Sequence, residues 1–164
     1  MNGKNVFVAF VILLLFWILL NNTFDPLILG VGAGLALLLS LLFCRRCNVF
    51  REVKLTPRAF VYTFIYLGVF MVELIKSNLD VARRVLSPRL PINPGIVEVK
   101  TGLSSKMGRM ILANSITLTP GTLTVDIQDD KLFIHWIDVK SDDIHEATQA
   151  IVHKFEKYLE VIYG

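Results

Sequence analysis

The N-terminal part of the sequence almost lacks ionisable side chains. In residues 6–43 the only one is Asp25, which lies in the single polar interruption of an otherwise apolar stretch of 38 residues. A small soluble domain could not bury so long an uncharged stretch, so this part is expected to be embedded in a membrane. Ion pathways inside membranes are usually marked by carboxylate, lysine or histidine side chains, and this stretch offers none for that purpose.

Cysteine is also scarce. The only two, Cys44 and Cys47, form a CxxC pair directly after the apolar stretch, with no second CxxC and no βαβ pattern nearby. They are interpreted as two thiols at the membrane surface, with palmitoylation or a redox role as the alternatives. The chain has no G-x-S-x-G, P-loop or dinucleotide fingerprint, so neither a catalytic residue nor a cofactor site is predicted.

The three histidines do not have the spacing of metal ligands. His135 lies in an apolar strand pattern and is expected to be partly buried, while His153 is two helical turns from His145. Asp142, His145 and Glu146 fall within one turn, but a solvated helix face explains them better than a metal. No metal site is predicted.

Basic residues are concentrated in the first part of the chain. Residues 1–94 carry 10 Lys and Arg against 4 Asp and Glu, whereas residues 95–164 carry 7 against 10. The basic part flanks apolar helices, so anionic lipid headgroups are its expected partner. Nucleic acid is not expected, because no basic face with interleaved stacking aromatics is present.

Residues 1–43 are predicted to form a transmembrane helical hairpin, with helices at 6–20 and 26–43. Pro26 suits the first turn of the second helix. Gly30 and Gly34 lie four residues apart on one face. They are interpreted either as a surface for close packing of another membrane helix, from the first helix or a different subunit, or as ordinary glycine usage in membrane helices. Residues 44–58 form a basic connector, which the positive-inside rule assigns to the cytoplasm together with the N-terminus.

Residues 59–86 are predicted to form a third helix, either spanning the membrane or lying in its interface. Hydropathy favours spanning, because the segment 59–75 begins with apolar residues around the whole helix and becomes amphipathic only towards its end. Charge favours the interface, because basic residues lie on both sides of the segment and the positive-inside rule would keep both groups cytoplasmic. Glu73 and Lys76, spaced i,i+3, are expected to form an ion pair at the membrane boundary, and the alternative is that Glu73 binds a proton or cation at a subunit boundary.

A proline-rich linker at 87–94 precedes a small domain at 95–164, expected in the cytoplasm. Alternating apolar residues predict strands at 95–101, 123–127 and 131–139, and helical patterns fall at 104–118 and 141–163. The predicted fold is thus a membrane α-helical part followed by a small α+β domain of order β-α-β-β-α.

The most distinctive segment of the domain joins its first helix to the next strand. It reads LANSITLTPGTLTVDI over residues 112–127 and is followed by LFIHWIDV. With these motifs the whole chain resembles the E subunit of the Mrp-type (Mnh, Pha; CPA3) multisubunit sodium/proton antiporters. The family-typical structural motif comprises Asn114, Thr117, Thr119, Pro120 and Gly121.

The resemblance implies a bacterial plasma-membrane complex that exchanges Na⁺, in some systems K⁺, for H⁺. In such complexes large subunits related to those of respiratory complex I carry the conducting residues, and the E subunit is a small component required for activity. The expected function is therefore a non-catalytic accessory subunit that contacts other hydrophobic subunits. The alternatives are a membrane-tethered enzyme domain or an adaptor unrelated to ion transport.

Overall fold

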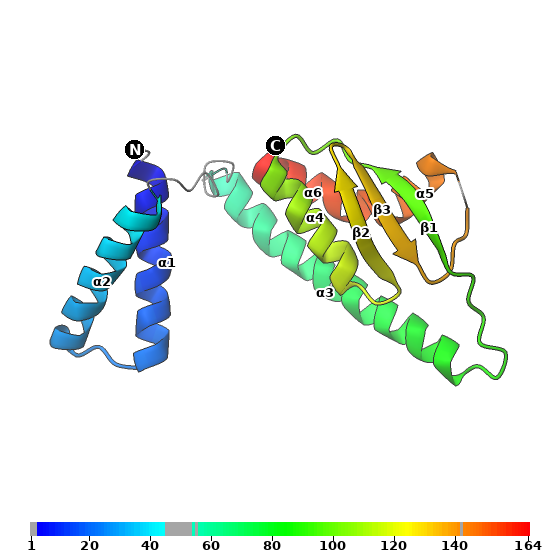
Figure 1. Ribbon diagram of the computed structural model, residues 1–164. Coiled ribbons are helices and arrows are strands. Elements are labelled where there is room, and N and C mark those ends of the chain that lie inside the picture. Colours follow the sequence, from blue (N-terminus) through cyan, green and yellow to red (C-terminus); the bar gives the residue numbers. More distant parts are fainter. Residues whose placement is uncertain (1–2, 45–53, 55, 142) are drawn as a thin grey trace. The chain divides into compact units, whose positions relative to one another are not determined.

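The computed structural model divides into two compact units, residues 1–53 and 54–164 (Figure 1). The structure describes residues 3–44, 54, 56–141 and 143–164. The basic connector and Cys47 therefore lie largely outside the described residues, and so does Asp142.

The first unit is an antiparallel hairpin of α1 (Gly3–Asn21) and α2 (Pro26–Cys44). Each helix has 19 residues and is about 28 Å long, which approaches the thickness of a bilayer's hydrocarbon core. Helix α1 is thus longer than predicted. Asp25 caps α2 by accepting a hydrogen bond from the Leu27 N–H at 2.8 Å, which explains the one carboxylate in residues 6–43.

A small residue other than the predicted pair makes the close contact between these helices. A Cβ atom on Gly32 would overlap the Trp17 ring of α1, and Trp17 Nε1 donates to the Ile28 carbonyl at 3.0 Å. Ala36 and Ser40 continue this buried face at four-residue intervals. Gly30 and Gly34 face open space within the described chain, so they leave a separate surface of α2 unoccupied.

The second unit begins with the long helix α3 (Pro57–Leu86). Thr56 caps it by accepting from the Ala59 N–H at 3.1 Å, and Pro57 occupies the first turn, where its missing N–H has no consequence. Its 30 residues correspond to about 45 Å. Pro57–Leu86 and Pro26–Phe43 are long and apolar enough to cross a membrane, and α1 contains a shorter apolar helix, Asn5–Asn21.

The α+β domain contains a three-stranded antiparallel sheet with strand order β1-β3-β2. The strands are β1 (Gly95–Lys100), β2 (Thr122–Gln128) and β3 (Lys131–Trp136), and α4 (Lys106–Leu118) connects β1 to β2. Strand β3 ends three residues earlier than predicted, and from Ile137 the chain bonds instead to the linker, where the Asn93 N–H donates to the Ile137 carbonyl at 3.1 Å.

The last predicted helix is two helices, α5 (Ile144–Ile151) and α6 (His153–Tyr163). The domain order is therefore β-α-β-β-α-α rather than β-α-β-β-α. The chain tightens at the fully buried Val152, whose carbonyl accepts from the Phe155 N–H at 3.0 Å. This break lets α5 pack on β1 while α6 packs on α3 and α4, which one straight helix would not do.

Helices α4, α5 and α6 cover one face of the sheet (Figure 1). The core between them is aliphatic and aromatic, and it includes Val97, Val99, Leu112, Ile116, Leu132, Ile134, Phe155 and Leu159. The opposite face of the sheet is open, with Ile96 63% exposed and Leu123 50% exposed. His135 lies between them in register and is exposed, so the expectation that it would be partly buried is wrong.

Candidate functional site

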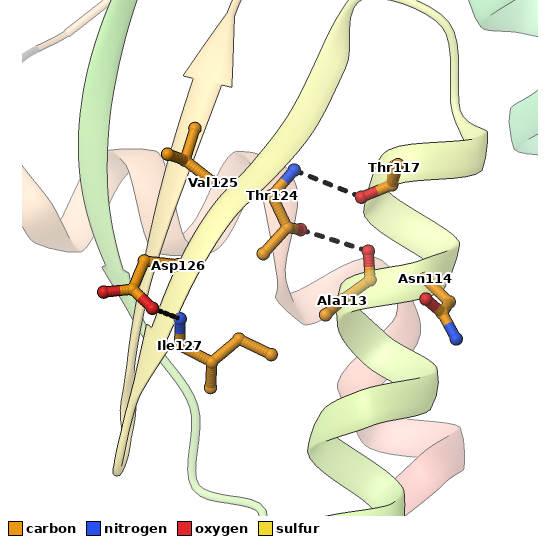
Figure 2. Close-up of a pocket in the computed structure, with 7 residues that line it drawn as sticks. All are labelled: Ala113, Asn114, Thr117, Thr124, Val125, Asp126 and Ile127. Atoms are coloured by element: carbon orange, nitrogen blue, oxygen red, sulfur yellow. Dashed lines mark hydrogen bonds between the residues drawn. The ribbon is translucent and has the colours of Figure 1, made fainter.

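The predicted structural motif runs from Asn114 and Thr117 in the last turns of α4 into the turn that leads to β2 (Figure 2). Thr119 ends α4: its N–H bonds to the Ser115 and Ile116 carbonyls, and its hydroxyl donates to the Ser115 carbonyl at 2.7 Å. Pro120 follows, and Gly121 has φ +92°, a left-handed conformation that favours glycine. Thr122 Oγ1 donates back to the Ile116 carbonyl at 2.6 Å, so hydroxyls satisfy the carbonyls left free at the helix end.

Thr117 ties the outer edge of β2 to α4. Its hydroxyl accepts from the Thr124 N–H at 3.1 Å, and the Thr124 hydroxyl donates to the Ala113 carbonyl at 3.1 Å (Figure 2). Strand β2 is an edge strand, and such edges invite pairing with other chains unless their polar groups are engaged. The Thr117 hydroxyl therefore engages one N–H of this edge, and the two hydrogen bonds together hold α4 against β2.

An open groove of about 540 Å³ lies beside this motif between α4 and β2. It is lined by Ala113, Asn114, Thr117, Thr124, Val125, Asp126 and Ile127. Its one carboxylate, Asp126, accepts from the Ile127 N–H and from the Gln128 amide, both at 2.8 Å. The threonine hydroxyls and the carboxylate of these lining residues make hydrogen bonds within the domain. We therefore interpret the groove as a structural contact between α4 and β2.

Metal-ligating side chains do not converge in the part of the chain that the structure describes. No group of three His, Cys, Asp or Glu residues is close enough there to hold an ion. Asp142, the third member of the helix turn with His145 and Glu146, lies outside the described residues.

Helix α3 is joined to the domain through aromatic side chains. The hydroxyls of Tyr66 on α3 and Ser115 on α4 share a short hydrogen bond. The Tyr66 and Phe70 rings pack against Phe155 of α6, with centroids 6.4 and 6.3 Å away. One side of α3 therefore belongs to the domain core.

The predicted partners Glu73 and Lys76 lie 3.0 Å apart, and a third residue joins them. Lys154 of α6 places its Nζ 3.4 Å from the other Glu73 oxygen. A carboxylate between two ammonium groups is held in its charged form, which makes Glu73 poorly suited to carrying protons. The cluster also links α3 to α6. Its position at a membrane boundary stays a prediction.

A second polar cluster fastens the far end of α3. The Arg84 guanidinium lies 2.7 Å from Asp80 and 2.9 Å from Asp138, and donates to the Pro91 carbonyl at 2.6 Å. Its side chain is only 14% exposed. The i,i+4 spacing of Asp80 and Arg84 was a visible signal for half of this cluster, but nothing in the sequence indicated that Asp138 would complete it.

Known proteins resemble this chain over nearly its whole length. The family model described as a Na⁺/H⁺ ion antiporter subunit matches residues 10–162. The chain belongs to this family of Na⁺/H⁺ antiporter E subunits. The Na⁺/H⁺ antiporter E subunit of Bacillus subtilis is 37% identical over 96% of this chain and 94% of its own length. The corresponding E1 subunit of Staphylococcus haemolyticus is 34% identical over 92% of each chain.

A solved structure also resembles this member of the E-subunit family. It is a chain of the membrane-bound sulfane sulfur reductase, an archaeal respiratory membrane complex, with 43% identity and a TM-score of 0.86. The similarity covers 97% of this chain and 99% of that one. It therefore includes the hairpin, α3 and the α+β domain.

Proposed function

We propose that this chain is a non-catalytic accessory subunit of a multisubunit antiporter that exchanges Na⁺ or K⁺ for H⁺ across the cell membrane. The observation that carries the proposal is membership of the E-subunit family over nearly the whole chain. The apolar hairpin supports the accessory role, because Asp25, the one ionisable side chain in residues 6–43, caps a helix. Large subunits related to those of respiratory complex I would then carry the ions.

The proposed arrangement has both the N-terminus and the α+β domain in the cytoplasm. The basic residues of the connector support this orientation through the positive-inside rule. Gly30 and Gly34 are proposed to face another membrane subunit, since the α1 contact already uses the face with Gly32. The motif from Asn114 to Gly121 is proposed to be structural.

The test is to purify the tagged full-length chain from its host in mild detergent and to identify the proteins that accompany it. Large antiporter-like membrane subunits are expected, and recovery of the chain alone would contradict the proposal. Gly30→Leu with Gly34→Leu should reduce the recovery of these partners. Val31→Leu, an enlargement on an exposed position of the same helix, is the matched control.

A second candidate is the corresponding subunit of a respiratory membrane complex. The 43% identity to a chain of an archaeal respiratory complex favours it specifically. The same purification separates the two candidates, because accompanying subunits with redox cofactors would indicate the respiratory complex, whereas antiporter subunits without them would indicate the antiporter.

A further inference from the structure

Helix α3 presents two faces of different character. Its inner face carries Tyr62, Tyr66, Phe70, Glu73 and Arg84, all of which contact the α+β domain. Its outer face is largely apolar along the helix and is interrupted by the exposed Asn78. It comprises Phe60, Val61, Phe64, Leu67, Met71, Val72, Ile75, Leu79 and Leu86, each about half exposed or more.

The inner contacts extend too far along α3 for the helix to cross a membrane. Tyr62 and Arg84 are 22 residues apart, a rise of about 33 Å, which exceeds the roughly 30 Å of a hydrocarbon core. Just before the helix, the Lys54 N–H also donates to the Ile162 carbonyl at 3.1 Å. A spanning α3 would therefore draw the domain into the bilayer with it.

The domain surface beside α3 is charged, so that burial in lipid is strongly unfavourable. Lys154 pairs with Glu73 near the middle of the helix, and Asp138 pairs with Arg84 near its end. Charged side chains are costly in the hydrocarbon region, and the open ends of helices and strands there would lose their water. If the apolar outer face contacts lipid, the inner face and the domain bound to it must therefore stay in water.

Basic side chains mark one edge of the outer face. Arg58, Lys76 and Arg83 are separated by 18 and 7 residues, close to five and two helical turns, so they share one edge of α3. The acidic residues Glu73 and Asp80 are both neutralised by paired cations. An apolar face with a cationic edge fits an anionic leaflet, because the apolar side chains can contact the acyl chains while the basic side chains contact the lipid phosphates.

We propose that α3 lies in the plane of the membrane interface, with its outer face in an anionic leaflet and the α+β domain on its other side. The chain then crosses the membrane only with α1 and α2, and both ends of α3 are on one side. This arrangement does not depend on which complex the chain joins.

The depth of the outer face tests the proposal directly. Single cysteines at Phe64, Met71 and Leu79 are introduced into the full-length Cys44→Ser, Cys47→Ser chain and labelled with a fluorophore. The control is Asp130→Cys, in the β2–β3 turn. The protein is placed in phosphatidylglycerol-containing vesicles with phosphatidylcholine brominated either near the headgroup or near the chain end, alone and in its purified complex.

All three outer-face sites should be quenched more by the shallow bromines than by the deep ones, at a common depth of about 5–10 Å, with Asp130 unaffected. Deep quenching at one site with shallow quenching at the others would mean that α3 crosses, and would overturn the proposal. Quenching that is lost in the complex would mean that a neighbouring protein covers the outer face, which also overturns it.

Sidedness gives an independent measurement. A membrane-impermeant maleimide is applied to oriented vesicles that carry Lys54→Cys, Arg89→Cys or Thr23→Cys in the same background. Lys54 and Arg89 flank α3, and Thr23 lies in the turn between α1 and α2. The first two sites should react from the same side and Thr23 from the other. Reaction of Arg89 together with Thr23 would show a third crossing.

Discussion

Replacing Gly121 by alanine tests the physical role of the motif. Gly121 has φ +92°, and a left-handed backbone costs a residue with a Cβ atom about 1–2 kcal/mol. The added Cβ would also lie 3.0 Å from Ile137 Cγ2, and such overpacking adds about 1 kcal/mol. Gly121→Ala is therefore expected to lower the free energy of unfolding of the domain by about 2–3 kcal/mol.

The two contributions can be separated with a double-mutant cycle. Ile137→Ala removes the Cγ2 atom that the new Cβ would meet, so in this background Gly121→Ala should cost only the backbone strain of about 1–2 kcal/mol. Gly102→Ala is the matched control, since a Cβ there has nothing within 4 Å and the residue is not left-handed. It should change stability by less than about 0.5 kcal/mol.

The assay must resolve the domain from the hairpin, because the two units need not unfold together. Hydrogen exchange of the β2 and β3 amides in the full-length chain under increasing denaturant reports the domain alone. Equal stability of Gly121→Ala and Gly102→Ala would refute the reasoning. A loss that persists unchanged in the Ile137→Ala background would refute only the steric part.

Three further substitutions test other contacts. Arg84→Ala should destabilise the α3–domain contact by about 1–2 kcal/mol in the same exchange assay, whereas the exposed Arg83→Ala should stay within about 0.5 kcal/mol. Glu73→Gln should leave proton antiport by the complex in everted vesicles intact, because Glu73 fastens helices; abolished antiport would reveal a proton carrier. Gly32→Leu should separate α1 from α2, seen as loss of a spectroscopic distance between labels on the two helices.

The sequence was sufficient to predict the elements whose apolar pattern is local. The hairpin follows from a long uncharged stretch with one turn. The β2–β3 hairpin follows from the alternation in residues 122–128 and the apolar segment that begins after the Asp129–Asp130 turn. The single last helix was wrong because Ile144, Ala147, Ile151 and Phe155 fit one helical stripe. The break after Ile151 arises because α5 and α6 pack on different elements. It therefore depends on tertiary contacts that the local apolar pattern does not show.

The candidate sites show the same limit. Lys76 was predictable as a partner for Glu73 from i,i+3 spacing, but Lys154 lies 81 positions away in the chain and only the fold brings it near. The glycine that contacts α1 was missed for a different reason. Gly30 and Gly34 fit a known spacing, yet Gly32 with Ala36 and Ser40 is an equally regular series of small residues. Spacing alone could not choose between two faces of one helix.

In the proposed interfacial arrangement, hydropathy alone would misjudge α3, because an average over a window does not record which side of the helix is apolar. The apolar residues of this helix serve two surfaces: Tyr66 and Phe70 fill the domain core, while the outer face is left for a different environment. The motif gains a role from this division. Ser115 bonds to Tyr66, and Gly121 lies against Val81, where a Cβ would be 3.7 Å from the valine methyl. By contacting α3 at two points, the last turn of α4 and the turn into β2 would determine which face of α3 the proposed arrangement presents to the membrane.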